Sequence, residues 1–192
     1  MRMPAMRMQV TIAAILVAGT AAATVAQQAH KHTAPAQPYA GQQLRAVTSL
    51  SPEELQGFLD GRGMGLARAA ELNGYPGPMH VLELEKELQL TAEQRRHVEQ
   101  AFDRMKTRAT GLGSRYVEAE RALDAAFRSG PADTAIIAAR VAEANRLLGE
   151  VRLSHLAAHL EITPLLTPEQ RQRYADLRGY GAAGHSQHKH NR

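Results

Sequence analysis

The chain has 192 residues, no cysteine and no tryptophan, and a formal net charge of +4 at neutral pH. The lack of cysteine excludes disulfides, thiol chemistry and cysteine-ligated zinc. The positive excess is too small to indicate a nucleic-acid-binding protein, and the apolar residues, mainly Leu, Ala, Val and Ile, favour helices over sheets.

Residues 1–26 have the organisation of a secretory signal. Arg2 and Arg7 precede an uncharged run from Val10 to Ala26, which ends in a small-x-small pattern that a signal peptidase cuts. The run is short and rich in Ala and Thr, so we expect cleavage after Ala26; an uncleaved membrane anchor is the alternative. Cleavage removes two of the 23 basic residues and leaves 21 against 19 acidic ones. We predict a periplasmic protein with no stable membrane span after cleavage and no nucleic-acid partner.

A polar linker over residues 27–38 precedes the predicted helices. Ser51-Pro52-Glu53-Glu54 predicts the start of a short helix, because Ser is a cap and Glu follows three residues later. A second short helix is predicted over residues 66–72, and Tyr75-Pro76-Gly77-Pro78 predicts a break.

Two long helices are predicted next. Thr91 caps the first, in which apolar residues recur every three or four positions from Val98 to Ala126, the spacing of a helix-packing seam. Gly111 and Gly113 in its middle predict a bend or a weak point. The segment Ser129-Gly130-Pro131 ends this helix.

The same spacing continues in the second long helix, which is capped by Asp133 and runs from Ile137 through Val141 to Ile162. The tight turn between the two predicts an antiparallel hairpin. A last short helix is predicted from Thr167 to about Arg178. The predicted fold is all-α, a long antiparallel helical hairpin with short flanking helices over residues 39–180, followed by a histidine-rich tail over residues 181–192.

The sequence Leu-Thr-x-x-Gln occurs twice, and each copy starts a predicted helix with a Thr cap and a Gln that completes a capping box. The motif residues are Leu90, Thr91, Gln94, Leu166, Thr167 and Gln170. Two copies in an exported, cysteine-free helical chain resemble the Spy/CpxP family of bacterial periplasmic proteins. Residues 63–66 and 71–80 resemble the branch of periplasmic heavy-metal sensors, whose relatives include ZraP and CnrX.

The resemblance covers residues 39–180 and implies a small helical homodimer with a cradle-like surface. Some members of the family are ATP-independent chaperones, others restrain envelope-stress signalling, and the metal-responsive relatives bind zinc, nickel or cobalt through His, Glu and Met. The leading prediction is an envelope-stress protein that binds unfolded periplasmic proteins or a sensor protein. The alternative is a heavy-metal sensor or buffer for zinc, copper, nickel or cobalt. No nucleophile–base arrangement, carboxylate pair or cofactor fingerprint is recognisable, so we predict no enzyme activity and no required cofactor.

His155 and His159 lie four residues apart on the second long helix, so their side chains share one face. If the hairpin turn centres near residue 131, His159 faces Asp103, and Glu99 lies one turn further along. Two imidazoles with one or two further ligands can hold zinc, nickel or copper. Two interpretations of the pair follow: His155 fills a core position with His159 at its flank, or His155, His159, Asp103 and Glu99 form a metal site.

Most of the other histidines gather at the two ends of the chain. They are His30, His32, His185, His188 and His190. Short histidine-rich tracts favour metal binding, and a polar solubilising tail is the alternative. His80, with Met79 and Glu83, follows the Pro-Gly-Pro break; because a helix N-terminus disfavours cations, we predict a capping or packing role for His80.

Overall fold

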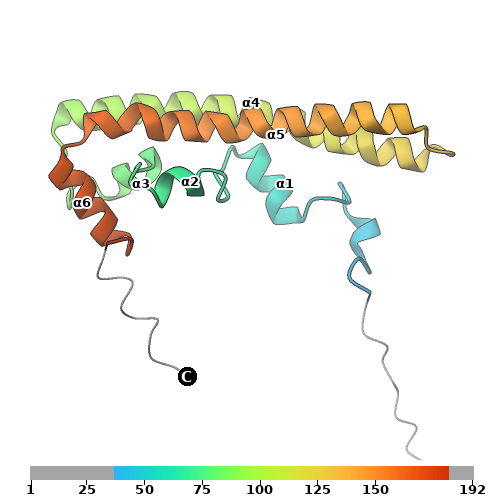
Figure 1. The fold of residues 1–192 in the computed structure, drawn as a ribbon, viewed down its shortest axis with the longest axis horizontal. Helices are drawn as coiled ribbons and strands as arrows, with labels where there is room; N and C mark the ends of the chain where they lie inside the picture. The colour runs from blue at the N-terminus through green and yellow to red at the C-terminus, as the bar shows by residue number, and fades with distance from the viewer. Residues whose placement is uncertain (1–36, 182–192) are drawn as a thin grey trace, which may run out of the picture. The chain divides into compact units, whose positions relative to one another are not determined.

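The computed structural model describes residues 37–181, and these residues form helices and loops without a strand (Figure 1). The helices are α1 (Pro52–Leu59), α2 (Arg68–Glu71), α3 (Pro78–Glu83), α4 (Ala92–Arg128), α5 (Thr134–Ile162) and α6 (Pro168–Leu177), with short 3-10 helices η1 (Gln42–Leu44) and η2 (Thr163–Leu165). They belong to one compact unit that begins at Tyr39. The all-α prediction is therefore confirmed. The predicted signal, most of the linker and the terminal histidines lie outside the described residues.

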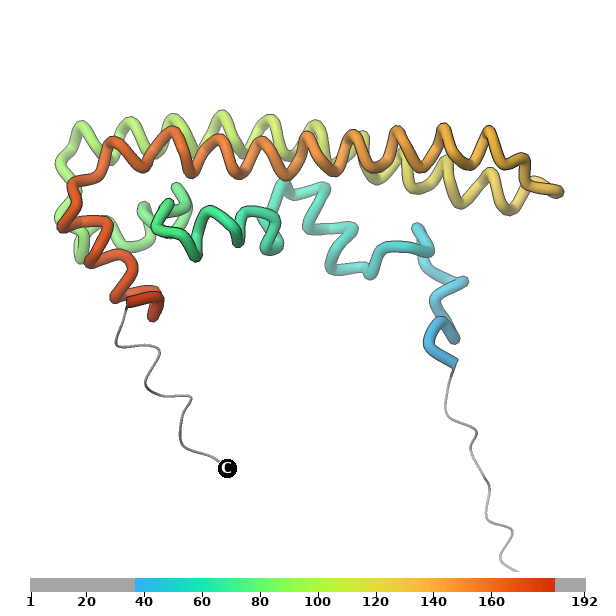
Figure 2. The backbone as a smooth tube through the Cα atoms, viewed as in Figure 1, coloured from blue at the N-terminus to red at the C-terminus, as the bar shows by residue number. Residues whose placement is uncertain are grey.

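Helices α4 and α5 form the predicted long antiparallel hairpin (Figure 2). Each begins at the predicted cap: the Thr91 hydroxyl accepts the N–H of Gln94 at 3.1 Å, and the Asp133 carboxylate accepts the N–H of Ala135 at 2.8 Å. These side chains satisfy N–H groups that have no partner in the first helical turn. The loop between the helices passes through Gly130 at a φ of 124°, in a conformation that favours glycine.

Two apolar clusters hold the short helices on the hairpin. In the first, Phe58 of α1 packs edge-on against Tyr116 of α4, with ring centroids 4.6 Å apart. The second joins α3 and α6 to α4 and α5, and its members are Val81, Leu88, Val98, Ala101, Ile162, Leu166 and Tyr174. Towards its turn the hairpin extends past the short helices (Figure 1), and Val141 is 40 % exposed there. The predicted burial of the seam is therefore wrong for Val141.

The two Leu-Thr-x-x-Gln motifs meet in space. Each forms the predicted capping box at the start of its helix. The Gln94 amide donates to the side-chain oxygen of Gln170 at 2.8 Å, and the Gln170 amide donates back at 3.1 Å. Each amide also donates to a carbonyl just before the other motif, Gln94 to Leu165 at 2.8 Å and Gln170 to Leu88 at 3.2 Å. This glutamine clasp, formed by Gln94 and Gln170, joins the N-termini of α4 and α6.

Helix α4 continues without interruption through its two central glycines. At Gly113 the backbone of α1 comes so close that a Cβ atom would lie 2.1 Å from the carbonyl oxygen of Phe58. At Gly111 a Cβ atom would meet nothing within 4 Å. Gly113 therefore permits the close approach of α1, a role that differs from the predicted bend.

Candidate functional site

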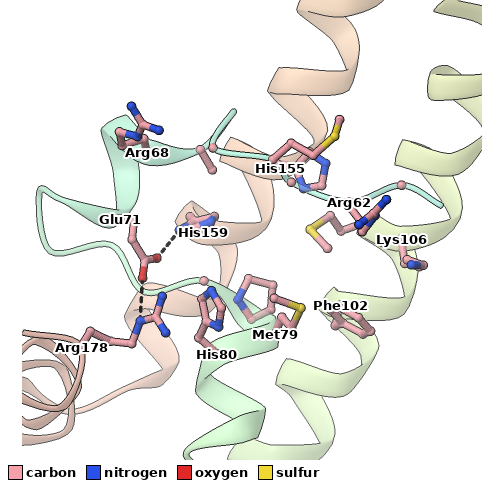
Figure 3. A pocket seen from close by; sticks show the side chains of 18 of the residues that line it. Arg62, Arg68, Glu71, Met79, His80, Phe102, Lys106, His155, His159 and Arg178 are labelled. Atoms are coloured by element: carbon pink, nitrogen blue, oxygen red, sulfur yellow. Dashed lines mark ion pairs between the residues drawn. The ribbon is translucent and has the colours of Figure 1, made fainter. Parts of the chain in front are cut away.

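A cavity of about 590 Å³ lies between the glycine-rich segment 61–80 and the hairpin. The segment contributes α2, the start of α3 and the loops around them, whereas Phe102 and Lys106 reach in from α4 and Arg178 from the end of α6 (Figure 3). His155 and His159 project from α5 into the same region (Figure 3). The short helices thus form a cover over the side of the hairpin that carries the histidine pair.

Potential metal ligands are concentrated in this cavity. Three methionines follow Met8 in the sequence, and all three line the cavity: Met64, Met79 and Met105. Four histidines lie among the described residues, and three of them line it: His80, His155 and His159. The fourth, His97 of α4, is half-buried elsewhere. Thioether sulfur and imidazole nitrogen are therefore the donors that this cavity offers in quantity.

His155 is buried, with 4 % of its surface exposed, and its Nε2 atom has no hydrogen-bond partner among the described residues. Burial lowers the pKa of His155, and the neighbouring His159 and Lys106 lower it further. The ring is therefore held in its neutral form, which can donate a lone pair to a metal ion. Gly63 lies against this ring, because a Cβ atom there would be 3.7 Å from Nδ1.

His159 is also buried, and its Nδ1 lies 2.7 Å from the backbone oxygen of Tyr75. A neutral ring that donates from Nδ1 keeps its lone pair on Nε2, and metal-binding histidines commonly make such a hydrogen bond to a carbonyl. Gly77 packs directly on the ring: a Cβ atom there would lie 2.9 Å from Cε1 and 3.1 Å from Nε2. Only glycine allows the chain to pass so close to His159.

Glu71 holds the cover to the hairpin. The Tyr174 hydroxyl donates to this carboxylate at 2.5 Å, and Arg178 lies 3.5 Å from the same oxygen. The second carboxylate oxygen of Glu71 lies 3.7 Å from Nδ1 of His159 (Figure 3). Burial raises the pKa of Tyr174, and the hydrogen bond and negative charge of Glu71 raise it further. The phenol therefore stays protonated, and the network connects α2, α5 and α6.

The structure brings together only part of the predicted helical metal site. His155 and His159 share the cavity, whereas Asp103 is exposed on α4, and Glu99 pairs with Arg95 at 3.0 Å. Neither carboxylate lines the cavity. Within residues 37–181, no group of three or more His, Asp or Glu side chains is arranged to hold a metal ion. The four-residue site stays a prediction, and the carboxylate that the described residues place beside His159 in the cavity is that of Glu71.

Sequence reasoning missed Glu71 because it placed the ligands of the helical site only on the two long helices. The segment that contains Glu71, Gly77 and Met79 nevertheless resembles the heavy-metal sensor branch, and this resemblance could have indicated that the segment contributes to a metal site. His80 bonds to Glu83 through Nδ1 at 2.8 Å, as a packing role would allow. The five terminal histidines lie outside the described residues.

The cavity has a positive rim. Arg62 and Arg178 have acidic partners, Asp60 at 3.6 Å and Glu71 at 3.5 Å. Two further cationic residues of the wall, Arg68 and Lys106, pair with no carboxylate in the described part of the chain. An ion that enters the cavity is therefore close to uncompensated positive charge.

These features define a helical hairpin protein with a cavity lined by histidine and methionine. The model of a family described as heavy-metal resistance matches residues 63–173, which is more than half of the chain. The chain belongs to this heavy-metal resistance family, which is related to the Spy/CpxP-like periplasmic helical proteins. The matched range includes the histidine pair, Glu71, the three cavity methionines and both glutamine motifs. No curated protein and no solved structure matches the chain significantly.

Proteins of this family are typically exported. Among the helices within residues 37–181, none combines the length and the apolar character that crossing a membrane requires.

Proposed function

We propose that the protein binds a heavy-metal ion in the cavity through His155 and His159, as a sensor or buffer that catalyses no reaction. The observation that carries this proposal is the buried Nε2 atom of His155, which has no hydrogen-bond partner among the described residues. A buried polar atom without a partner costs free energy, because it has lost its hydrogen bond to water. A metal ion that accepts the imidazole lone pair removes this cost. Membership of the heavy-metal resistance family supports the same function.

The residues around the histidine pair fit a metal ion of the zinc, copper, nickel or cobalt group. Each of these ions accepts imidazole nitrogen, and His159 has its Nδ1 engaged with Tyr75, which leaves Nε2 as the ligating atom. Glu71 positions His159, since its own carboxylate is already engaged by Tyr174 and Arg178. Further ligands come from the cavity methionines or from water.

Binding in this position stabilises the packing of the segment 61–80 on α5. The histidines belong to α5, whereas Met64 and Met79 belong to the segment 61–80, so an ion that holds both links the two parts. A ligand that binds only the folded state stabilises it by about 2.7 kcal/mol at a free concentration of about 100 times its Kd. In a sensor, a partner protein would detect the stabilised packing of the segment 61–80 on α5.

Calorimetric titration with zinc, copper, nickel and cobalt tests the proposal. The reference protein is the full chain with the five terminal histidines replaced by serine, called here the tail-serine chain. We expect one site per chain for at least one ion, and an affinity loss of about tenfold or more when His155→Gln and His159→Gln are introduced together. The matched control, His97→Gln, should bind like the reference. Binding that disappears in the tail-serine chain, or that survives the double substitution, contradicts the proposal.

Binding of unfolded proteins or a sensor partner is a second candidate function. It is supported by the outer face of α5, where Leu153 and Leu160 are 56 % and 58 % exposed. These leucines continue a series with alternating spacings of four and three residues: Ala135, Ala139, Ala142, Arg146, Gly149, Leu153, Leu156 and Leu160. Such spacing favours packing against another helix.

We propose a second copy of the chain as the occupant of this α5 face. In an antiparallel pair centred between Arg146 and Gly149, the leucines of each copy meet the alanines of the other, so large and small side chains alternate across the seam. Leu153→Ser with Leu160→Ser should convert a homodimer to a monomer in sedimentation velocity. A wild-type monomer at tens of micromolar contradicts the dimer. A client can use this face only when the two copies are apart, and protection of an aggregating client should then fall in this variant; unchanged protection contradicts client binding there.

We also propose export to the periplasm by cleavage after Ala26, with an assignment to the Spy/CpxP-like proteins. The uncharged run from Val10 to Ala26 and the typical export of the family support this location. Intact-mass analysis of protein from the periplasmic fraction should show a chain that begins at Gln27. A full-length chain retained in the membrane fraction would contradict cleavage.

A further inference from the structure

The methionine sulfurs indicate which kind of ion the cavity favours. We infer that the cavity selects a soft monovalent cation, copper(I) or silver(I), over zinc, nickel and cobalt. This inference rests on the proposed metal-binding function and concerns the same cavity. Three independent features of the described residues carry it: the lack of a group of three imidazole or carboxylate ligands, the placement of the thioethers and the charge of the rim.

The first feature is the shortage of hard ligands. Zinc sites built from protein side chains take four ligands, or three with a water, from thiolate, imidazole and carboxylate groups. Among residues 37–181 no group of three such side chains is arranged to hold a metal. Among the described residues Glu71 is the one acidic residue that lines the cavity, and it is engaged by Tyr174 and Arg178. Soft monovalent ions accept a lower coordination number, so two imidazoles and a thioether suffice for them.

The second feature is the placement of the methionines. Thioether ligands select copper(I) among the transition metals because both partners are soft. Met64, Met79 and Met105 come from three different parts of the chain, the loop before α2, helix α3 and helix α4. They therefore do not form the single-helix stripe of an ordinary apolar core. Met64 and Met79 also remain 41 % and 46 % exposed, although they are apolar.

Met64 is held in place at a conformational cost. Its φ of 42° lies in the left-handed region, which residues other than glycine rarely adopt. Its sulfur atom occupies the space above Gly57, where a Cβ atom would lie 2.0 Å from the sulfur. Glycine at position 64 would relieve the backbone but would remove the thioether from the cavity wall. The chain therefore keeps a methionine at a position of the cavity wall that disfavours a side chain.

The third feature is the positive rim. Arg68 and Lys106 line the cavity and pair with no carboxylate in the part of the chain that the structure describes. Coulomb repulsion is proportional to the charge of the entering ion, so these cations repel a divalent ion twice as strongly as a monovalent one. Neither the imidazoles nor the thioethers carry a negative charge that would compensate this repulsion. The rim therefore adds to the preference that the sulfur ligands create.

Silver(I) is the probe, because it is monovalent, soft and stable without a reductant. We expect the tail-serine chain, in chloride-free nitrate buffer, to bind one silver(I) per chain roughly tenfold or more tightly than zinc. Met79→Leu with Met105→Leu should weaken silver binding by roughly tenfold or more and leave any zinc binding unchanged. These swaps conserve side-chain volume and the fold, which circular dichroism checks. Methyl signals of methionines labelled with carbon-13 should shift with silver and not with zinc.

The outcomes separate this inference from the function on which it rests. Zinc, nickel or cobalt binding as tight as that of silver would show that the soft-ion inference is wrong. The metal function would still stand if this binding is lost with His155→Gln and His159→Gln and is unchanged by the methionine substitutions. If neither silver nor any divalent ion binds the tail-serine chain, both are wrong. Silver binding that is unaffected by the two leucine substitutions, without a methionine methyl shift, also overturns the inference.

Discussion

The contact between α1 and α4 at Gly113 predicts opposite effects of alanine at two glycines of α4. Gly113 and Gly111 lie two residues apart in the same helix, and alanine is the better helix former at either position. At Gly113 a Cβ atom would lie 2.1 Å from the carbonyl oxygen of Phe58 and 2.8 Å from its carbonyl carbon. At Gly111 it would meet nothing within 4 Å. Gly111→Ala is therefore a matched control for Gly113→Ala.

The magnitudes follow from helix propensity and packing. Replacing glycine by alanine inside a helix stabilises it by about 1 kcal/mol, which is the whole effect expected at Gly111. At Gly113 the obstacle is the backbone of α1, so no side-chain rotation relieves the contact. Overpacking costs about 1–3 kcal/mol, and a backbone clash belongs at the upper end. We expect Gly113→Ala to lower the free energy of unfolding by about 2 kcal/mol net, and the two variants to differ by about 3 kcal/mol.

Urea unfolding followed by circular dichroism measures both effects. With a slope of about 2 kcal/mol per molar urea, the midpoint should fall by about 1 M in Gly113→Ala and rise by about 0.5 M in Gly111→Ala. Equal midpoints for the two variants would refute the reasoning, because they would mean that α1 does not pack on α4 at Gly113. A lower midpoint in both variants would show that alanine destabilises α4 itself at these positions, independently of the contact with α1.

Three other predictions concern the glutamine clasp, a buried tyrosine and the wall of the cavity. Gln94→Ala and Gln170→Ala should each lower the free energy of unfolding by about 1–2 kcal/mol, and a double-mutant cycle should give a coupling above about 0.5 kcal/mol; strictly additive effects would mean that the amides do not interact. Burial, and secondarily nearby carboxylates, raise the pKa of Tyr116, so the folded state keeps a proton that the unfolded state loses near pH 10. The stability that the protonated Tyr116 contributes is therefore present below about pH 10 and is lost as the pH rises. Tyr116→Phe should reduce the slope of the unfolding free energy against pH, above about pH 10, by up to about 1.4 kcal/mol per pH unit. An unchanged slope would contradict the raised pKa. Gly77→Ala should displace the ring of His159 and raise the Kd of a metal ion bound in the cavity by about tenfold. An unchanged Kd would mean that His159 is not a ligand.

The parts of the fold that depend on local chemistry were predictable from the sequence. Thr91, Asp133 and Thr167 are helix caps whose function needs only the next three residues, and all three act as predicted. The apolar spacing identified the hairpin for the same reason. It did not identify how far the short helices extend, and the exposed Val141 is the result.

The cavity depends on tertiary contacts that spacing alone does not reveal. The histidine pair was found because four residues on a helix place two side chains on one face. Glu71 lies in a short irregular segment, so no periodic pattern indicated that it would reach His159. The same holds for Met64 and Met79, which meet α4 and α5 only after the segment 61–80 has folded over the hairpin. Long-range contacts of this kind need a structure.

The central claim is that a metal ion lies between the short-helix cover and the histidine pair. The most direct test is a crystal structure of the full chain loaded with silver or zinc, with the metal located by its anomalous scattering. We expect one strong peak within bonding distance of Nε2 of both His155 and His159, enclosed by Gly63 and Gly77. Peaks confined to the terminal histidines or the outer surface, with no metal in the cavity, would contradict the claim.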